Sequence, residues 1–258
     1  MKIGISTACL RKEYETEDAF NIIKDLGAET CEVYFKTFYE YRPEFAKKYA
    51  ERLSGVEVNS IHVAPNNFEP QLFYDKRRER GDGFYWLDQI LRSAQLLGAK
   101  NYTFHGFARK GGERENLGDW AGHIWEISNF CARYGVKLCL ENVRWCLYNR
   151  PSVFRELKNR CSDLLAVFDI KQARKSAYPY KMYLNDMSGA ISHVHISDVD
   201  ENGKTCLPSF GVYDFKEIFK NLKGAGFDGA VIIETENFKD ISDIKRSIEF
   251  LKETADKT

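Results

Sequence analysis

Val231-Ile232-Ile233-Glu234 is the stretch that shows most directly how this chain folds, because three β-branched residues are closed by a carboxylate. An apolar run of this length is typical of a buried strand, so the carboxylate lies where the strand leaves the core. Five further runs carry a histidine or a carboxylate at or next to their ends: Ser60-Ile61-His62-Val63, Tyr102-Thr103-Phe104-His105, Leu138-Cys139-Leu140-Glu141, Ala166-Val167-Phe168-Asp169 and Ser192-His193-Val194-His195. Six such ends in one chain predict a shared site.

Strand-like and helical patterns alternate along the whole chain. Strands are expected at residues 2–6, 30–35, 57–64, 101–106, 136–141, 164–169, 191–196 and 229–234. Helical patterns between them are typical of βαβ units in a parallel sheet. Eight units of about 32 residues fit a closed barrel better than an open doubly wound sheet, and no G-x-G-x-x-G follows the first strand. We therefore expect one α/β domain over residues 1–258, a single (β/α)8 TIM barrel.

The composition excludes several classes of function. The 38 Lys and Arg residues balance the 38 Asp and Glu residues, and 43% of the chain is apolar. This balance gives no positive excess that would attract nucleic acid. No stretch approaches the roughly 20 apolar residues of a membrane span, and residues 1–6 form a strand pattern rather than a signal peptide. We expect a cytoplasmic protein without a nucleic-acid or membrane partner.

The seven cysteines contain no C-x-x-C pair. A disulfide framework or a structural zinc cluster would show paired spacing. We therefore expect most of these cysteines to be buried free thiols.

The polar strand ends matter because TIM barrels build their active sites at the C-terminal ends of the strands. Glu141, Asp169, His195 and Glu234 end strands five to eight and could together hold one divalent ion. Carboxylates favour manganese or magnesium, and the imidazole admits zinc or cobalt. Manganese is the expected ion. Glu236 has the same side-chain parity as Glu234 and is the alternative ligand from strand eight.

Other polar residues are expected near the same face. His193 points to the same side as His195, one layer lower, and is either a buried partner of the site or a ligand. His62 and His105, at the ends of strands three and four, are expected to contact a substrate, with a buried structural role as the alternative. Trp145 fits either a sugar-binding wall or the core, and Arg109-Lys110-Gly111-Gly112 has the composition of a flexible lid.

Several segments resemble, in order and spacing, the xylose isomerase-like TIM-barrel superfamily, which includes sugar-phosphate isomerases and epimerases and the endonuclease IV branch. They are Leu140-Glu141-Asn142, Phe168-Asp169, His193-Val194-His195-Ile196-Ser197-Asp198 and Ile233-Glu234. Residues 207–215, LPSFGVYDF, are similar to the superfamily's L-P-G-x-G-x-x-D-F stretch, with Ser209 in place of the first glycine.

The resemblance implies a metal held by Glu141, Asp169, His195 and Glu234. It also implies that Glu141 and Glu234 act as an acid/base pair on opposite faces of a keto sugar, and that Glu32 lies inside the barrel beside the site. The chemistry is coherent, because removing a proton next to a carbonyl needs a base and a positive charge near the developing oxyanion.

Two positions depart from the superfamily pattern. Gln172 stands where a substrate-contacting histidine is frequent, and Glu201 stands where ketose 3-epimerases have an arginine. Lys171 shares the parity of Asp169 if the chain stays extended, which would carry its ammonium into the pocket beside Gln172; otherwise it caps a loop or neutralises Asp169. An anionic substrate group would suit this lysine. We expect an acidic or phosphorylated keto sugar rather than a free hexose.

Three classes of function stay open from the sequence. The first is a metal-dependent isomerase or epimerase acting on a keto sugar or sugar derivative, with a small-molecule sugar or sugar phosphate as its substrate. The second is a polyol-ketone dehydratase that uses the same proton abstraction, and the third is a non-catalytic carbohydrate-binding barrel. An enzyme of the endonuclease IV type would need a three-metal cluster and a basic DNA-binding face, which the sequence does not support. The sequence leaves open whether the protein forms a homo-oligomer.

Overall fold

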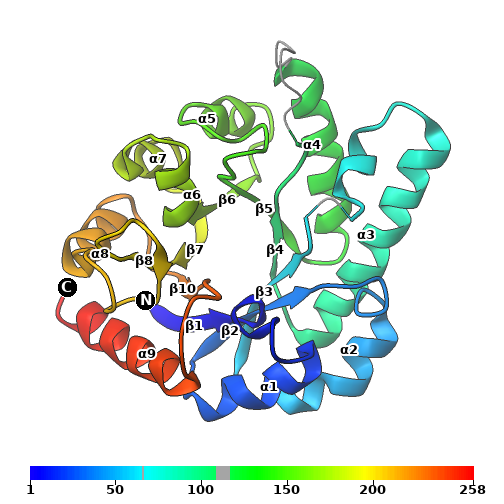
Figure 1. Ribbon diagram of the computed structural model, residues 1–258. Coiled ribbons are helices and arrows are strands. Elements are labelled where there is room, and N and C mark those ends of the chain that lie inside the picture. Colours follow the sequence, from blue (N-terminus) through cyan, green and yellow to red (C-terminus); the bar gives the residue numbers. More distant parts are fainter. Residues whose placement is uncertain (66, 109–116) are drawn as a thin grey trace.

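Eight parallel strands close into a barrel in the order β1-β10-β7-β6-β5-β4-β3-β2, as Figure 1 shows for this computed structural model. The strands are β1 (Lys2–Ser6), β2 (Thr30–Phe35), β3 (Glu57–Val63), β4 (Asn101–Phe104), β5 (Lys137–Glu141), β6 (Leu165–Asp169), β7 (Ile191–Ile196) and β10 (Ala230–Ile233). Each begins and ends within two residues of its expected range, so the predicted TIM barrel is confirmed. The structure describes residues 1–65, 67–108 and 117–258, and the expected lid at Arg109-Lys110-Gly111-Gly112 lies outside these ranges.

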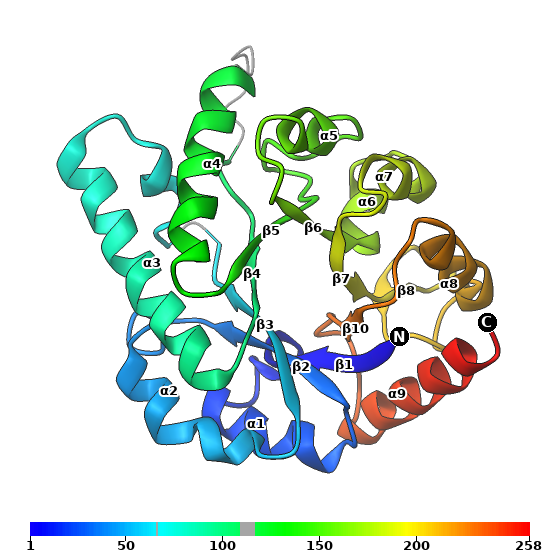
Figure 2. The same cartoon turned by 180° about the vertical axis from the view of Figure 1, so that it is seen from behind.

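The helices surround the barrel, as the view from behind in Figure 2 also shows. They are α1 (Thr16–Asp25), α2 (Pro43–Tyr49), α3 (Arg77–Leu97), α4 (Leu117–Ala132), α5 (Val153–Lys158), α6 (Ile170–Lys175), α7 (Tyr180–Asp186), α8 (Phe215–Gly224) and α9 (Ile241–Asp256). Shorter elements are the 3₁₀ helices η1 (Thr7–Leu10), η2 (Ala50–Leu53) and η3 (Glu69–Phe73), and the two-stranded sheet of β8 (Asp198–Val199) and β9 (Thr205–Cys206). None of the helices in the described ranges has the length and apolar character that crossing a membrane requires.

Burial explains why these residues form these elements. Every residue of β2 and β10 is buried, as expected for strands with the barrel interior on one side and helices on the other. The helix α8 buries Phe215, Ile218, Phe219 and Leu222, whose spacing forms one apolar stripe. All seven cysteines are free; six are buried and Cys206 is half-buried, in agreement with the predicted thiols.

The strand register brings the polar ends to one level. In the β6–β7 pair, Asp169 lies beside His195. In the β10–β7 pair, Ile233 lies beside Ile196, so Glu234 follows directly at the barrel mouth. The parallel arrangement therefore gathers Asp169, His195 and Glu234, which are up to 65 residues apart in the printed sequence, at the same end of the barrel.

Candidate metal centre at the barrel mouth

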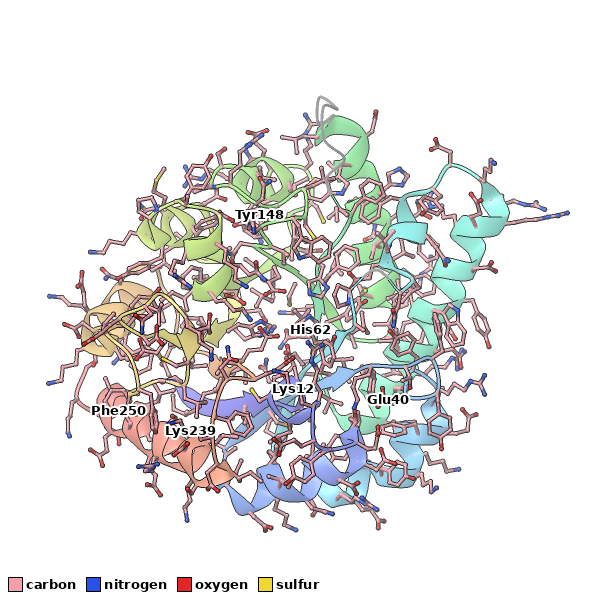
Figure 3. The ribbon with its side chains drawn as sticks, in the orientation of Figure 1. Lys12, Glu40, His62, Tyr148, Lys239 and Phe250 are labelled. Carbon is pink, nitrogen blue, oxygen red and sulfur yellow. The ribbon has the colours of Figure 1, made fainter. Side chains whose placement is uncertain are left out.

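A cavity of about 370 Å³ opens at the C-terminal ends of the strands. Figure 3 shows His62 near the centre of the barrel. The cavity is lined by Ala8, Arg11, Lys12, Tyr34, His62, Pro65, His105, Glu141, Val143, Trp145, Lys171, Gln172, Lys175, Thr205, Glu234, Thr235, Glu236 and Asn237. Its size and its mixture of polar and apolar walls suit a small molecule.

Glu141, Asp169, His195 and Glu234 converge beneath this cavity. Each offers a ligand atom within 4.8 Å of those of the others. The His195 Nδ1 atom lies 3.3 Å from Glu141 Oε1 and 3.7 Å from Glu234 Oε2. Three carboxylates this close, two of them buried and the third, Glu234, partly buried, repel one another unless a cation compensates them. The four residues predicted from the strand ends thus form one compact cluster.

Two oxygens of the cluster have no hydrogen-bond partner. They are Glu141 Oε2 and Asp169 Oδ2, and both are buried. A buried charged oxygen without a donor is costly, and a bound ion would remove this cost. The donor set of three carboxylates and one imidazole fits manganese and also admits zinc.

Lys171 reaches the cluster by a different route from the one predicted. The chain is not extended after Asp169, because α6 begins at the next residue and the Asp169 side chain accepts a hydrogen bond from the Gln172 amide at 2.8 Å. The first turn of α6 nevertheless directs the ammonium into the cavity. Lys171 Nζ lies 2.7 Å from Glu234 Oε2 and 3.6 Å from Asp169 Oδ2. Both expected placements of the ammonium are therefore seen together, because it lines the cavity and also pairs with Asp169, whereas the extended backbone assumed for the first placement is wrong.

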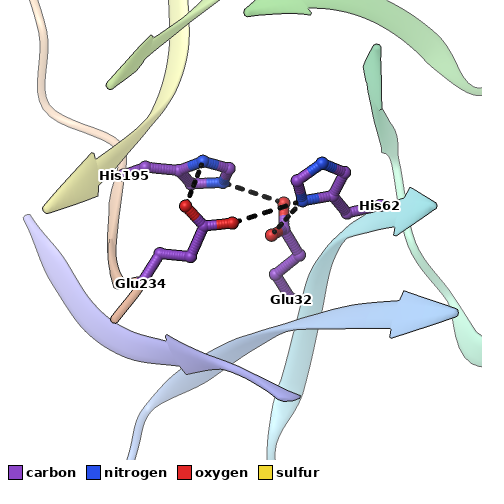
Figure 4. Close-up of side chains that lie close together, drawn as sticks. All are labelled: Glu32, His62, His195 and Glu234. Atoms are coloured by element: carbon purple, nitrogen blue, oxygen red, sulfur yellow. Dashed lines mark hydrogen bonds and ion pairs between the residues drawn. The ribbon is translucent and has the colours of Figure 1, made fainter. Parts of the chain in front are cut away.

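Glu32 lies below the cluster, where Figure 4 shows it between His62 and His195. It is fully buried, and its carboxylate lies 3.1 Å from both His62 Nδ1 and His195 Nε2. The same carboxylate accepts hydrogen bonds from Ser60 at 2.9 Å and Thr103 at 2.7 Å. Burial alone would raise the pKa of Glu32, but the positive charge of the two imidazoles holds this pKa well below its usual value. Because Glu32 occupies the Nε2 side of His195, the Nδ1 atom is left to face Glu141 and Glu234.

His193 lies one layer lower, as predicted. It is fully buried, and its Nε2 atom is 2.9 Å from the Thr103 hydroxyl and 3.4 Å from Glu32. It therefore supports the carboxylate of Glu32 and does not line the cavity.

His62 and His105 face each other with their Nε2 atoms 2.8 Å apart, and both line the cavity. Glu69, in η3, fixes His105 by accepting a hydrogen bond from its backbone amide at 3.2 Å and by approaching its Nδ1 atom to 3.4 Å. Burial lowers the pKa of His105, but the Glu69 carboxylate outweighs burial and raises this pKa to about 9. Glu141 Oε2 lies 3.4 Å from His105 Nε2.

Two other groups of ligand-type atoms share His62. One adds Glu32, His195 and Glu234, and the other adds His105 and Glu141. The oxygens of Glu32 are already engaged by hydroxyls and imidazoles. The group around Asp169 is favoured for an ion because it contains both unpartnered oxygens.

The sequence did not single out Arg11, Lys12 or Tyr34, which line the cavity from the β1 and β2 ends. Arg11 and Lys12 both pair with Glu236, the alternative ligand. Glu236 is thus engaged at the cavity rim, while Glu234 lies in the cluster. No polar strand-end signal marks Arg11 and Lys12, because they follow the short helix η1 rather than β1 itself.

Of the remaining residues named from the sequence, Gln172 and Trp145 line the cavity and Glu201 does not. Gln172 lines it, and its side-chain oxygen accepts a hydrogen bond from the Arg144 amide at 3.3 Å. Trp145 also lines the cavity, with its ring centroid 5.9 Å from that of His105. Of the two positions expected for Trp145, the structure therefore shows the cavity wall and not the core. Glu201 is exposed and does not line the cavity.

A profile of the xylose isomerase-like TIM barrel family matches residues 20–254. Among curated proteins, the uncharacterized protein MJ1311 of Methanocaldococcus jannaschii is 32% identical over 136 residues, which cover 50% of this chain and 45% of that protein. The match thus spans less than half of the length of this relative.

Solved structures with similar folds cover nearly the whole chain. A D-tagatose 3-epimerase-like protein has a TM-score of 0.79 at 21% identity, covering 100% of this chain and 99% of its own. The probable 3-DHS dehydratase AsbF of Bacillus anthracis has a TM-score of 0.78 at 14% identity, covering 98% and 99%. An IolI protein with a bound zinc atom has a TM-score of 0.77 at 17% identity, covering 98% and 96%. At these identities the similarity concerns the fold.

Proposed function

The chain belongs to the xylose isomerase-like TIM barrel family, and on this basis we propose that it is a divalent-metal-dependent isomerase or epimerase of a keto sugar or sugar derivative. One observation carries the proposal. Two glutamates, the buried Glu141 and the partly buried Glu234, meet at a cluster whose geometry suits an ion and which lies under a cavity of sugar size. The epimerase-like structure among the similar folds supports the reaction class.

We propose that Glu141, Asp169, His195 through Nδ1, and Glu234 hold one divalent ion, with manganese as the expected metal. The zinc atom in the similar IolI structure supports a metal in a barrel of this kind. When bound, the ion supplies Lewis-acid stabilisation of negative charge on a substrate oxygen. The two buried carboxylate oxygens without a hydrogen-bond donor, Glu141 Oε2 and Asp169 Oδ2, support metal dependence.

Glu141 and Glu234 are proposed to move the proton. They come from β5 and from the end of β10, so they approach the cavity from different sides of the cluster. Burial would raise the pKa of each, but His195 beside Glu141 and Lys171 beside Glu234 hold both pKa values below the usual range. Both side chains are therefore ionised near neutral pH. One carboxylate can take a proton from the carbon next to the carbonyl, and its partner, after it has taken up a proton from water, can return that proton on the opposite face.

His62, His105, Lys171 and Gln172 are proposed to bind the substrate. All four line the cavity. Glu32 and Glu69 hold the Nδ1 atoms of His62 and His105, and the two Nε2 atoms face each other at the cavity wall. A substrate hydroxyl that inserts between these Nε2 atoms would meet two rings whose orientation is already fixed.

The test combines metal analysis with proton exchange. After reconstitution with Mn²⁺, we expect about one ion per chain in the wild type and a large loss of bound metal in His195→Ala. A panel of keto sugars in D₂O should show deuterium incorporation next to the carbonyl. Glu141→Gln and Glu234→Gln should each slow this exchange by roughly 10²- to 10⁴-fold.

Glu40→Gln is the matched control, because Glu40 is a buried glutamate that does not line the cavity. Exchange at the wild-type rate in either Glu141→Gln or Glu234→Gln would refute the two-carboxylate mechanism. Release of water with the exchange would assign the dehydratase instead.

A further inference from the structure

The helix α6 brings two lysines to the cavity. Lys171 and Lys175 are four residues apart and therefore lie on the same face of this helix, and both line the cavity. Lys171 pairs with Glu234 and Asp169. Lys175 is exposed, and in the described ranges no carboxylate lies within ion-pairing distance of it. Among the residues that the structure describes, no carboxylate thus serves as counter-ion to this ammonium at the rim.

The rim formed by η1 adds further positive charge. Arg11 and Lys12 share the single carboxylate of Glu236, and the Arg11 guanidinium also donates to the Tyr34 hydroxyl at 3.0 Å. Figure 3 shows Lys12 near the barrel centre. Two cations paired with one carboxylate leave a net positive rim on this side as well.

A divalent ion in the cluster would increase this excess of positive charge. Glu234 and Asp169 are at once the proposed ligands and the ion-pair partners of Lys171. An ion bound to their oxygens would neutralise them and repel the ammonium. The cavity would then carry more positive than negative charge, and a cleft with a single sign of excess charge attracts a ligand of the opposite sign.

We propose that the cavity recognises its substrate through an anionic group, a carboxylate or a phosphate, that binds Lys175 and Lys171 on α6 and faces the Arg11–Lys12 rim. The subsite rests on the proposed function, since it places the keto end of the substrate at the metal cluster and the anionic end at α6. Gln172, on the same turn of the helix, offers a neutral donor between the two lysines.

The experiment is isothermal titration of the Mn²⁺-loaded protein with three ligands: D-fructose, D-fructose 6-phosphate and D-fructuronate. Lys175→Met removes the unpaired ammonium, and Lys220→Met, an exposed lysine on α8 outside the cavity, is its matched control. We expect at least one anionic ketose to bind at least tenfold more tightly than D-fructose. If D-fructose 6-phosphate binds more tightly than D-fructuronate, the recognised group is a phosphate; if D-fructuronate binds more tightly, it is a carboxylate.

In Lys175→Met the preference for the anionic ketose should fall about tenfold, whereas Lys220→Met should keep it. Equal affinities for all three ligands, an unchanged preference in Lys175→Met, or no binding of either anionic ketose would overturn the subsite. Deuterium exchange is followed separately. Its absence for every ketose would refute the proposed reaction, while the titration would still decide the subsite.

Discussion

Lys171 lies beside two proposed metal ligands, with its ammonium 2.7 Å from Glu234 and 3.6 Å from Asp169. It therefore occupies the region in which a divalent ion would meet electrostatic repulsion. We predict that Lys171→Met binds Mn²⁺ about tenfold more tightly than the wild type, as measured by titration of the metal-free protein. Lys175→Met, whose ammonium does not contact the cluster, should change the affinity less. Weaker binding in Lys171→Met would show that the lysine supports the ion instead of competing with it.

Glu32 acts on the cluster through His195 without lining the cavity. A carboxylate that accepts from the distal nitrogen of a ligating imidazole fixes its orientation and increases its basicity. We predict that Glu32→Gln weakens Mn²⁺ binding by roughly 10- to 100-fold. Glu40→Gln is a suitable comparison because Glu40 is equally buried but lies away from the cavity. If both variants keep the wild-type metal affinity, Glu32 stabilises the barrel core and does not contribute to metal binding.

At the level of elements, the polar strand ends could be read from the sequence because each ligand candidate directly closes an apolar run. The start of α6 could not be read in the same way. Asp169 is both the last residue of β6 and the side-chain cap of α6, so no turn residue separates the two elements. Glu69 was also missed, because it comes from η3, whose sequence has no periodic pattern. Its role depends on tertiary contacts with His105 and Tyr102.

The segment 207–215 contains a testable case of backbone strain. Ser209 has φ of +74°, in the left-handed region, and stands where the superfamily stretch has glycine. It is exposed, so its side chain adds little packing. We predict that Ser209→Gly stabilises the protein by about 0.5–1 kcal/mol, because relief of the left-handed strain outweighs the added freedom of the unfolded chain. Urea unfolding gives the midpoint for each protein. Ser209→Ala keeps the strain and should show no gain in stability. Equal midpoints for the wild type and both variants would exclude the strain.

For the whole molecule, the eight strands, the barrel and the four-residue cluster follow from a pattern that the sequence displays directly. Arg11, Lys12 and Trp145 do not, because loops carry them to the cavity and loop paths depend on contacts between distant segments. The sequence thus predicts the cluster beneath the cavity better than the rim around it. This difference has a physical cause, because the proposed metal ligands lie at the ends of rigid strands and the residues of the rim lie on loops.

Metal binding should stabilise the whole barrel in a pH-dependent way. Burial raises the pKa of Asp169 to about 7, with the charges of Glu141 and Glu234 adding to this effect against the opposing charge of Lys171. The folded metal-free protein therefore holds a proton between about pH 4 and 7 that the unfolded chain has lost, so this group's contribution to stability falls as the pH rises through that window. His105, whose folded pKa of about 9 lies above its ordinary value, loses its contribution as the pH rises further. A metal ligand must be deprotonated. The ion therefore binds best at the higher pH values, at which protonated Asp169 no longer stabilises the metal-free protein.

We predict that Mn²⁺ at 100-fold over its dissociation constant at pH 8 raises the Tm by roughly 5–10 °C. At pH 6 and the same Mn²⁺ concentration, Asp169 is mostly protonated, and the increase should be smaller by roughly 3–5 °C because the affinity falls about tenfold. Thermal unfolding in both buffers, with and without a chelator, measures the two increments. Asp169→Asn, which keeps the shape of the side chain but cannot ionise, should give a small increment that depends less on pH. The remaining dependence comes from His195, whose pKa, despite the lowering effect of burial, lies well above its ordinary value because of the Glu32 and Glu234 carboxylates and which also loses a proton when it binds the ion. An equal increment at pH 6 and pH 8 in the wild type would mean that the ion does not displace a proton from Asp169, and the ligand set would have to exclude it.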